Sequence, residues 1–155
     1  TTTNLIGNGT WLLLTHEAEF ARLRADPALV ASTVEEMLRY EGSIQLNNRR
    51  LLEPIKLGGR HLPAGTFITI GIGAANRDPA QFPDAERFDV GRKPNRHLAF
   101  GQGDHACAGM NVARLEARIA VGRLVARLPA LQLAGMPERD RRVRFRGFRH
   151  LPVSA

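Results

Sequence analysis

The stretch of sequence that decides the fold reads Phe100-Gly101-Gln102-Gly103-Asp104-His105-Ala106-Cys107-Ala108-Gly109. Cys107 is the only cysteine of the chain, so no internal disulfide can form and a free thiol needs an explanation. It follows a glycine-rich loop, whose backbone can turn tightly, and precedes a predicted helix, whose N-terminal N–H groups stabilise a thiolate. From this setting alone, a functional thiolate and an inert buried side chain are equally supported.

The spacing within this stretch resembles the haem-ligand loop of the cytochrome P450 superfamily, Phe-Gly-x-Gly-x-His-x-Cys-x-Gly, with every fixed position matched. A chance match in a chain of this composition has odds on the order of one in a million. The resemblance implies that the cofactor is haem b (iron protoporphyrin IX) and that the Cys107 thiolate is the axial ligand of its iron. It also implies that Phe100 shields the sulfur and that Gly101 and Gly109 belong to the same cofactor-binding loop.

The resemblance also supplies partners for the two haem carboxylates, which need cations or hydrogen-bond donors when they are buried. Arg49, His97 and His105 occupy positions similar to the propionate ligands of the family. We therefore expect all three side chains to contact the haem.

A second motif concerns support of the cysteine loop. Glu36-Met37-Leu38-Arg39 is similar to the family's Glu-x-x-Arg helix motif, and residues 82–89 are similar to its meander segment. A Glu and an Arg three positions apart on a helix are by themselves usually a solvated pair. The resemblance implies instead that Arg87 joins Glu36 and Arg39 in a buried charge network, which is structural and holds the loop that carries the cysteine.

The start of the chain and two later segments concern the reaction itself. Thr1 resembles the threonine of the motif Ala-Gly-x-(Asp/Glu)-Thr, which implies a catalytic role in proton delivery, with the acid lying just before it. Ile44, Gln45 and Phe145 are expected to line the substrate pocket. Ser43 stands where the family commonly has a proline, and this departure leaves the local backbone path open.

Composition and hydrophobic patterning fit one domain of 155 residues, with 43% hydrophobic and 24% charged residues. The densest apolar run is Trp11-Leu12-Leu13-Leu14, far below the roughly 18 residues of a membrane span, so no membrane contact is expected. The net charge of +7 indicates an acidic partner without choosing among nucleic acids, membranes, cofactors and proteins.

Together these features predict a mainly α protein with small β-sheets (α+β), the C-terminal haem-binding lobe of the cytochrome P450 fold, truncated at the N-terminus. We expect a single domain over residues 1–155. The predicted segments are the end of the central helix (1–14), a short helix (16–25), the Glu-x-x-Arg helix (27–40), short sheets (44–73), the meander and cysteine loop (76–109), the cysteine helix (107–128) and terminal strands (131–154). Strands are predicted at 49–56, 66–72, 142–145 and 151–153.

The resemblance implies a haem-thiolate monooxygenase that uses O2 to oxidise a small organic substrate. A ferredoxin or flavodoxin type of electron donor would dock on basic residues of the cysteine helix, and a cytoplasmic location is expected. The missing N-terminal part of the same protein would complete the pocket, so the fragment alone is expected to be inactive. The docking residues are Arg114, Arg118, Arg123 and Arg127.

One alternative is a haem-binding remnant or sensor without turnover, which keeps Cys107, His97, His105 and Arg49 but lacks the proton-delivering acid. The sequence upstream of Thr1 would discriminate, since an intact Ala-Gly-x-(Asp/Glu) favours the enzyme.

Two further alternatives are a nucleic-acid-binding module and a zinc site. The arginine-rich C-terminal segment favours the first, but the chain has no zinc-finger spacing and no regular aromatic platform, so no nucleic acid is expected as a partner. One cysteine with scattered histidines does not give the usual four-ligand spacing of zinc.

Overall fold

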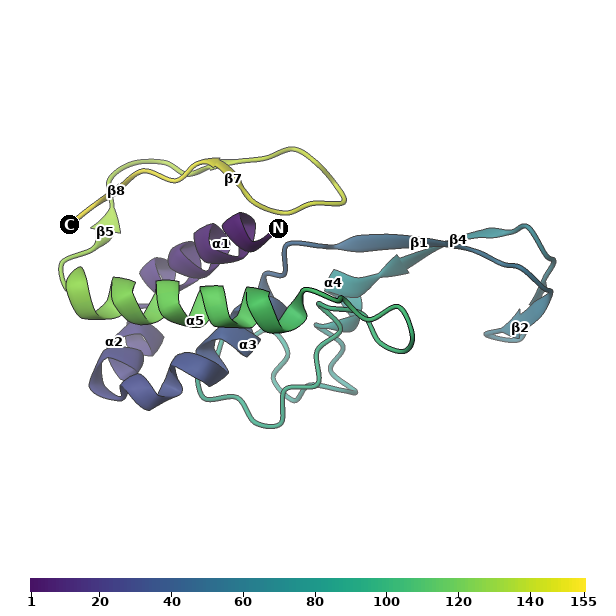
Figure 1. Ribbon diagram of the computed structural model, residues 1–155, viewed down its shortest axis with the longest axis horizontal. Coiled ribbons are helices and arrows are strands. Elements are labelled where there is room, and N and C mark those ends of the chain that lie inside the picture. Colours follow the sequence, from purple (N-terminus) through teal and green to yellow (C-terminus); the bar gives the residue numbers. More distant parts are fainter.

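The computed structural model describes residues 1–155 and shows a helical body from which a long two-stranded arm extends, with the C-terminal segment lying along one side (Figure 1). No helix is both long and apolar enough to span a bilayer. The helices are α1 (Thr2–Thr15), α2 (Glu17–Ala25), α3 (Val30–Tyr40), α4 (Ile72–Ala75) and α5 (Met110–Arg127), with a 3-10 turn at Pro27–Leu29. The strands are β1 (Leu46–Arg50), β2 (Ile55–Leu57), β3 (Arg60–Leu62), β4 (Phe67–Gly71), β5 (Gln132–Leu133), β6 (Glu138–Arg139), β7 (Phe148–His150) and β8 (Val153–Ser154).

The hydrophobic core lies where α1, α3 and α5 pack together, with α2 closing one end. Each fully buried aliphatic side chain there stabilises the fold by roughly 1.5–3 kcal/mol. Helices α1 and α3 approach closely at Gly9, where an added Cβ would lie 2.4 Å from the Met37 sulfur. The core includes Leu12, Leu13, Leu23, Val34, Met37, Ala117 and Val121.

The start of the Glu-x-x-Arg helix differs slightly from the predicted span of 27–40. Asp26 accepts a hydrogen bond from the Ala28 N–H (3.1 Å), and Pro27 occupies the first turn, as expected for a helix start. That first turn is a 3-10 turn, and the α-helix proper begins at Val30.

The arm consists of β1 paired antiparallel with β4, followed by the β2–β3 hairpin. The prediction of one strand over 49–56 was wrong in its bounds, because Pro54 has no N–H to donate and the pairing of β1 ends at Arg50. The prediction also missed β3, which is only three residues long and directly follows the tight turn at Gly58 and Gly59, both with positive φ.

The C-terminal segment forms two small antiparallel pairs, β5 with β8 and β6 with β7. The predicted strand at 142–145 was wrong: these residues form the loop between β6 and β7. Their backbone pairs with the segment after α3, where the Gln45 N–H donates to Arg144 (2.9 Å) and the Arg146 N–H donates to Ser43 (2.9 Å). The prediction at 151–153 was displaced, since β7 ends before it and β8 begins at Val153.

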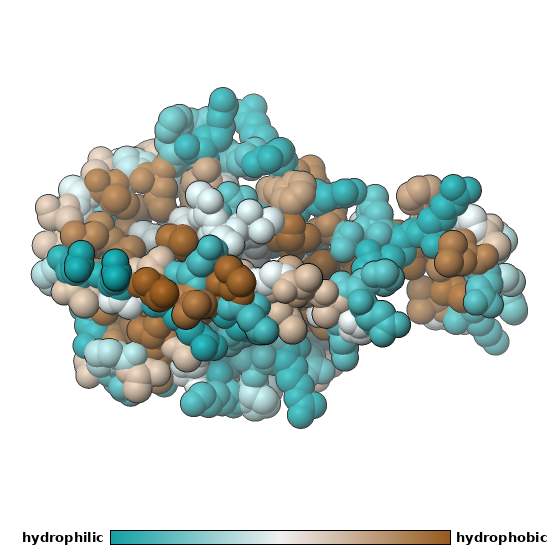
Figure 2. Space-filling view, viewed as in Figure 1, coloured by the Kyte–Doolittle hydropathy of each residue, from teal (hydrophilic) through white to brown (hydrophobic).

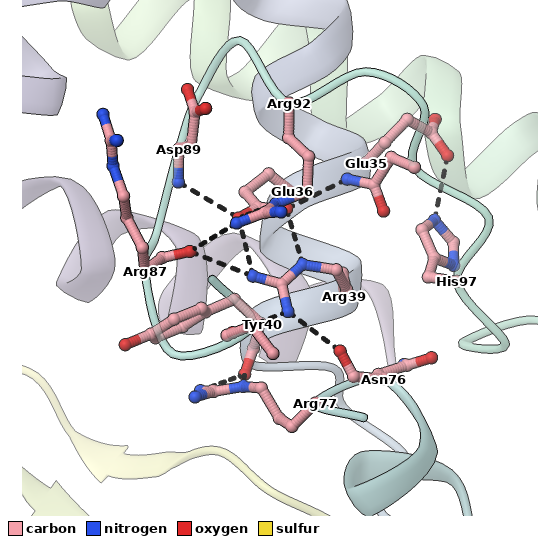
Figure 3. A network of polar contacts seen from close by, with 12 residues as sticks. Glu35, Glu36, Arg39, Tyr40, Asn76, Arg77, Arg87, Asp89, Arg92 and His97 are labelled. Atoms are coloured by element: carbon pink, nitrogen blue, oxygen red, sulfur yellow. Dashed lines mark hydrogen bonds and ion pairs between the residues drawn. The ribbon is translucent and has the colours of Figure 1, made fainter. Parts of the chain in front are cut away.

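The buried pair of Glu36 and Arg39 ties α3 to the long loop between α4 and α5 (Figure 3). Both side chains have 0% exposure, and Arg39 donates to both Glu36 oxygens at 2.8 Å. The remaining Arg39 Nη1 hydrogens reach the carbonyls of Asn76 (2.8 Å) and Ala85 (2.9 Å). These two charges are therefore paired and also bonded to the backbone of the loop, as buried ions must be.

Arg87 enters this network only through its carbonyl, which accepts from Arg39 at 3.1 Å, while its side chain is exposed and points away in Figure 3. The expected guanidinium is supplied by Arg92, whose Nε lies 3.1 Å from Glu36. Asn95 donates to the other Glu36 oxygen (3.0 Å). The prediction for Arg87 is thus corrected, because its side chain lies in solvent and the charge facing Glu36 comes from Arg92.

Replacing Arg39 with Met is expected to lower the free energy of unfolding by about 3–5 kcal/mol, since a fully buried carboxylate loses its main partner. Urea denaturation followed by circular dichroism measures this loss. A loss below about 1 kcal/mol would contradict the assigned role of the pair.

Arg92→Met and Arg87→Met separate the two arginines. Arg92→Met is expected to cost roughly 1.5–3 kcal/mol, because it removes a charge-assisted bond to Glu36. Arg87→Met is expected to change stability by no more than about 0.5 kcal/mol, as for most exposed side chains. Equal losses in the same denaturation experiment would show that the Arg87 side chain does belong to the network.

Candidate functional site

A cavity of about 650 Å³ lies between the start of α1, the strand β1 and the cysteine loop before α5. Its size is within the usual range of ligand and cofactor pockets. Segments far apart in the sequence converge on it, so it is a product of the tertiary fold. The lining residues are Thr1, Thr2, Leu5, Leu38, Ser43, Ile44, Asn47, Arg49, Ile72, Ala99, Phe100, Gly101, His105, Cys107, Gly109, Val112, Ala113 and Glu116.

Cys107 lies at the wall of this cavity with its side chain exposed. Its N–H donates to the Phe100 carbonyl at 2.9 Å, which closes the loop on itself. Gly101 and Gly103 have φ of 71° and 79°, a backbone conformation that disfavours side chains, so the loop path needs glycine there.

The cysteine helix predicted over 107–128 begins later, at Met110. Cys107 lies in the turn before it, and its carbonyl accepts from the Met110 N–H (3.2 Å). Cys107 therefore lies in the turn that leads into the helix and not within the helix itself.

Most of the residues singled out from the sequence meet at this cavity. Besides Cys107, they are Thr1, Ile44, Arg49, Phe100, Gly101, His105 and Gly109. Arg49 comes from β1 and His105 from the cysteine loop, so two groups able to bind carboxylates line the same cavity as the thiol. This convergence is the main geometrical finding of the site.

His97 is not brought to the cavity, in contrast to its expected contact with the haem. Its side chain is 3% exposed, and its Nε2 lies 3.0 Å from Glu35 (Figure 3). Its other nitrogen, Nδ1, accepts from the Ala99 N–H at 3.2 Å. Both ring nitrogens are thus bonded within the protein, and the expected haem contact of His97 stays a prediction.

Gln45 and Phe145 also do not line the cavity, whereas Ile44 does. The Gln45 Nε2 donates to the Gly42 carbonyl (2.6 Å), which turns the side chain back toward α3. Phe145 pairs with Ile44 through an isolated β-bridge, and the Arg142 guanidinium lies 5.6 Å from its ring centroid. Of the three predicted pocket residues, only Ile44 is placed at the wall.

Polar residues of the wall that were missed include Thr2, Asn47 and Glu116. Asn47 lies two positions before Arg49 on β1, and the period of a strand places both on one face, so this signal was available. Glu116 lies in α5 at helical spacing from Val112 and Ala113, which also line the cavity.

Glu35 binds the helix α5 and the cysteine loop at the same time. Arg114 donates to both of its oxygens (2.8 and 3.0 Å), and Arg118 lies 3.7 Å away. Burial opposes ionisation, but the hydrogen bonds from His97 and Arg114 outweigh it and lower the pKa of the Glu35 carboxyl to about 2. Two of the four arginines expected to form a docking face are therefore engaged within the protein.

The cavity fits a haem in the chemistry of its wall. The chain has one thiol, and it lines the cavity, as one axial thiolate ligand requires. Arg49 and His105 can pair with two carboxylates. The rest of the wall is largely apolar and suits the faces of a flat hydrophobic ring, with Leu5, Leu38, Ile72, Ala99, Phe100 and Val112.

Comparison with known proteins gives the same assignment. The chain is 45% identical over 154 residues to 6-deoxyerythronolide B hydroxylase of Saccharopolyspora erythraea, covering 97% of this chain and 38% of that protein. It is 49% identical over 138 residues to the cytochrome P450 monooxygenase PikC of Streptomyces venezuelae, covering 88% of this chain and 33% of that one.

Solved structures agree in fold. The structure of P450BioI with an acyl carrier protein ligated to hexadec-9Z-enoic acid superimposes with a TM-score of 0.96 at 42% identity, covering 99% of this chain and 40% of that one. The chain therefore spans about two fifths of the length of the relatives that it matches most fully. The family model described as Cytochrome P450 matches residues 22–143, and this protein belongs to the cytochrome P450 family.

Proposed function

We propose that this chain is the haem-binding part of a monooxygenase, with Cys107 as the ligand of the iron. The observation that carries the proposal is the convergence of one thiol and two carboxylate-binding groups, Arg49 and His105, on a single cavity of about 650 Å³. Family membership independently implies a haem with a cysteine thiolate.

The chemistry at the site divides between the cofactor and the chain. When bound, haem supplies the activation of O2 and the oxidation of an organic substrate. The chain presents the Cys107 sulfur on a loop fixed by the hydrogen bond to Phe100 (2.9 Å). Arg49 and His105 would hold the haem carboxylates, and the Phe100 side chain would keep water from the sulfur.

Thr1 lines the same cavity and is proposed to hold a proton at its Oγ1. Its carbonyl accepts from the Leu5 N–H (2.9 Å) and from the Ser43 hydroxyl (3.0 Å), which anchors the residue at the start of α1. Its own side chain makes no capping bond to α1, and the residue lines the cavity. The hydroxyl is thus available to a proton path.

The substrate is proposed to be a small organic molecule whose reacting part is hydrocarbon, because the wall of the cavity is mainly apolar. The relatives support this class, since they include a hydroxylase named for 6-deoxyerythronolide B and a protein solved with an unsaturated fatty acid on its carrier.

The electron donor is proposed to be an acidic ferredoxin or flavodoxin, in a cytoplasmic setting. Arg123 and Arg127 on α5 are exposed and form no ion pair, whereas Arg114 and Arg118 are held by Glu35. Arg123 and Arg127 would therefore supply most of the electrostatic attraction between α5 and the donor.

Turnover is proposed to require more polypeptide than these residues. Leu115 and Ile119 lie four positions apart on one face of α5, outside the cavity wall, and are 59% and 49% exposed. Figure 2 shows apolar residues gathered on the surface of the helical body. An apolar face of this kind normally packs against further protein.

A haem titration of the chain and of Cys107→Ser tests the proposal. The reduced, CO-bound chain is expected to show the red-shifted Soret band of a thiolate-ligated haem, and this band should vanish in the variant, because serine does not replace the sulfur. A histidine-type spectrum in both proteins would contradict the assignment of Cys107. Thiolate-type binding without oxidation of any substrate by an upstream-extended chain would favour a haem sensor instead.

Arg49→Gln and His105→Gln are expected to weaken haem binding by roughly tenfold each, as for loss of a charge-assisted hydrogen bond. Arg50→Gln is the matched control for Arg49, since it is the next residue on β1, does not line the cavity and lies over the Phe67 ring. His61→Gln, in the exposed hairpin, is the control for His105. Equal effects of the site and control variants on the haem Kd would exclude the proposed contacts.

A further inference from the structure

Glu35 lies at a point where three parts of the protein meet. It belongs to α3, it contacts His97 in the segment leading into the cysteine loop, and it binds Arg114 on α5. Its side chain is 20% exposed and accepts three hydrogen bonds between 2.8 and 3.0 Å. A carboxylate with this many charge-assisted partners is strongly held in place.

The bonds of His97 fix its tautomer. Nδ1 accepts from the Ala99 N–H, so it carries no hydrogen, and Nε2 must be the nitrogen that donates to Glu35. The ring therefore links the Glu35 carboxylate to the backbone immediately before Phe100. Through it, α3 fixes the entry of the cysteine loop.

Arg114 links Glu35 to the other side of the same loop. Its guanidinium lies 4.7 Å from the centroid of the Phe100 ring, in the geometry of a cation–π contact. The Phe100 carbonyl in turn accepts the N–H of Cys107. A continuous chain of contacts thus runs from Glu35 through Arg114 and Phe100 to Cys107.

We propose that Glu35 is a positioning residue for the cysteine loop, which it braces from His97 on one side and from Arg114 on the other. In this role His97 is a structural link between Glu35 and the backbone before Phe100. The neighbouring Glu36 has a separate task, because its partners Arg39, Arg92 and Asn95 all hold the preceding meander. The effect of Glu35 on the order of the cysteine loop does not involve haem. Only its effect on haem ligation rests on the proposed function.

The direct test is hydrogen exchange of the full chain, followed by mass spectrometry, in the wild type and in Glu35→Gln. Glutamine keeps the size of the side chain but removes the charge that binds His97 and Arg114. Peptides covering 97–109 are expected to exchange faster by roughly tenfold or more, while those of α1 keep their protection.

Glu41→Gln is the matched control. Glu41 is also a mainly buried carboxylate with two arginine partners, Arg139 (2.7 Å) and Arg146 (3.3 Å), but it holds the C-terminal segment. This variant should loosen residues 139–147 and leave the cysteine loop protected. Unchanged exchange of 97–109 in Glu35→Gln, or equal loosening of that loop in Glu41→Gln, would overturn the proposal.

Arg114→Lys replaces Glu35→Gln if the latter unfolds the chain. Lysine keeps the positive charge but cannot donate two parallel hydrogen bonds to Glu35, so the same loop-specific loosening is expected, and its absence would overturn the proposal. With haem added, the thiolate-type Soret band of the reduced CO form should weaken in Glu35→Gln and persist in Glu41→Gln. Failure of every protein to bind haem would count against the proposed function, whereas the exchange result decides the brace alone.

Discussion

The buried ion pair of Glu36 and Arg39 is the interaction on which the rest of the structure depends. Two charges without solvent exposure are costly unless every polar atom is satisfied, and here the backbone carbonyls of the long meander complete the set. The meander has almost no regular structure of its own, so its path follows from the positions of these bonds. The helix α3 thereby acts as the template on which a long irregular segment is ordered.

Because of helix geometry, two adjacent residues of α3 contact different segments of the chain. Successive side chains on an α-helix point about 100° apart, so Glu35 and Glu36 face different neighbours. Glu36 faces the meander through Arg92 and Asn95, while Glu35 faces the cysteine loop and α5 through His97 and Arg114. Two neighbouring carboxylates on one rigid element therefore hold consecutive parts of the loop that ends at Cys107.

The cavity depends on the position of the same cysteine loop. The cysteine loop, strand β1 and the start of α1 each contribute polar groups to it, and apolar residues fill the spaces between them. Cys107 lies in a turn before α5, so helix geometry does not fix the position of its thiol. Its position follows from the hydrogen bond to Phe100 and from glycines whose backbone conformation other residues disfavour.

Sequence alone determined the family and the mainly helical fold class, and it singled out Cys107 as the candidate ligand of the iron, because the loop motif combines rare residues at fixed spacing. Helices were predictable since their periodicity and the Asp26-Pro27 start are local signals. The short strands were placed less well, because two- and three-residue pairings depend on a distant partner more than on local propensity.

Only the tertiary structure decided which side chains face which partner. Arg87 and Arg92 carry the same charge within one loop, and in the folded chain only the Arg92 side chain reaches Glu36. His97 resembles a haem ligand in its spacing, yet Glu35 and the Ala99 N–H take both of its nitrogens. A sequence motif specifies residue types and intervals, whereas the direction of a side chain depends on hydrogen-bond partners brought together from distant segments by folding.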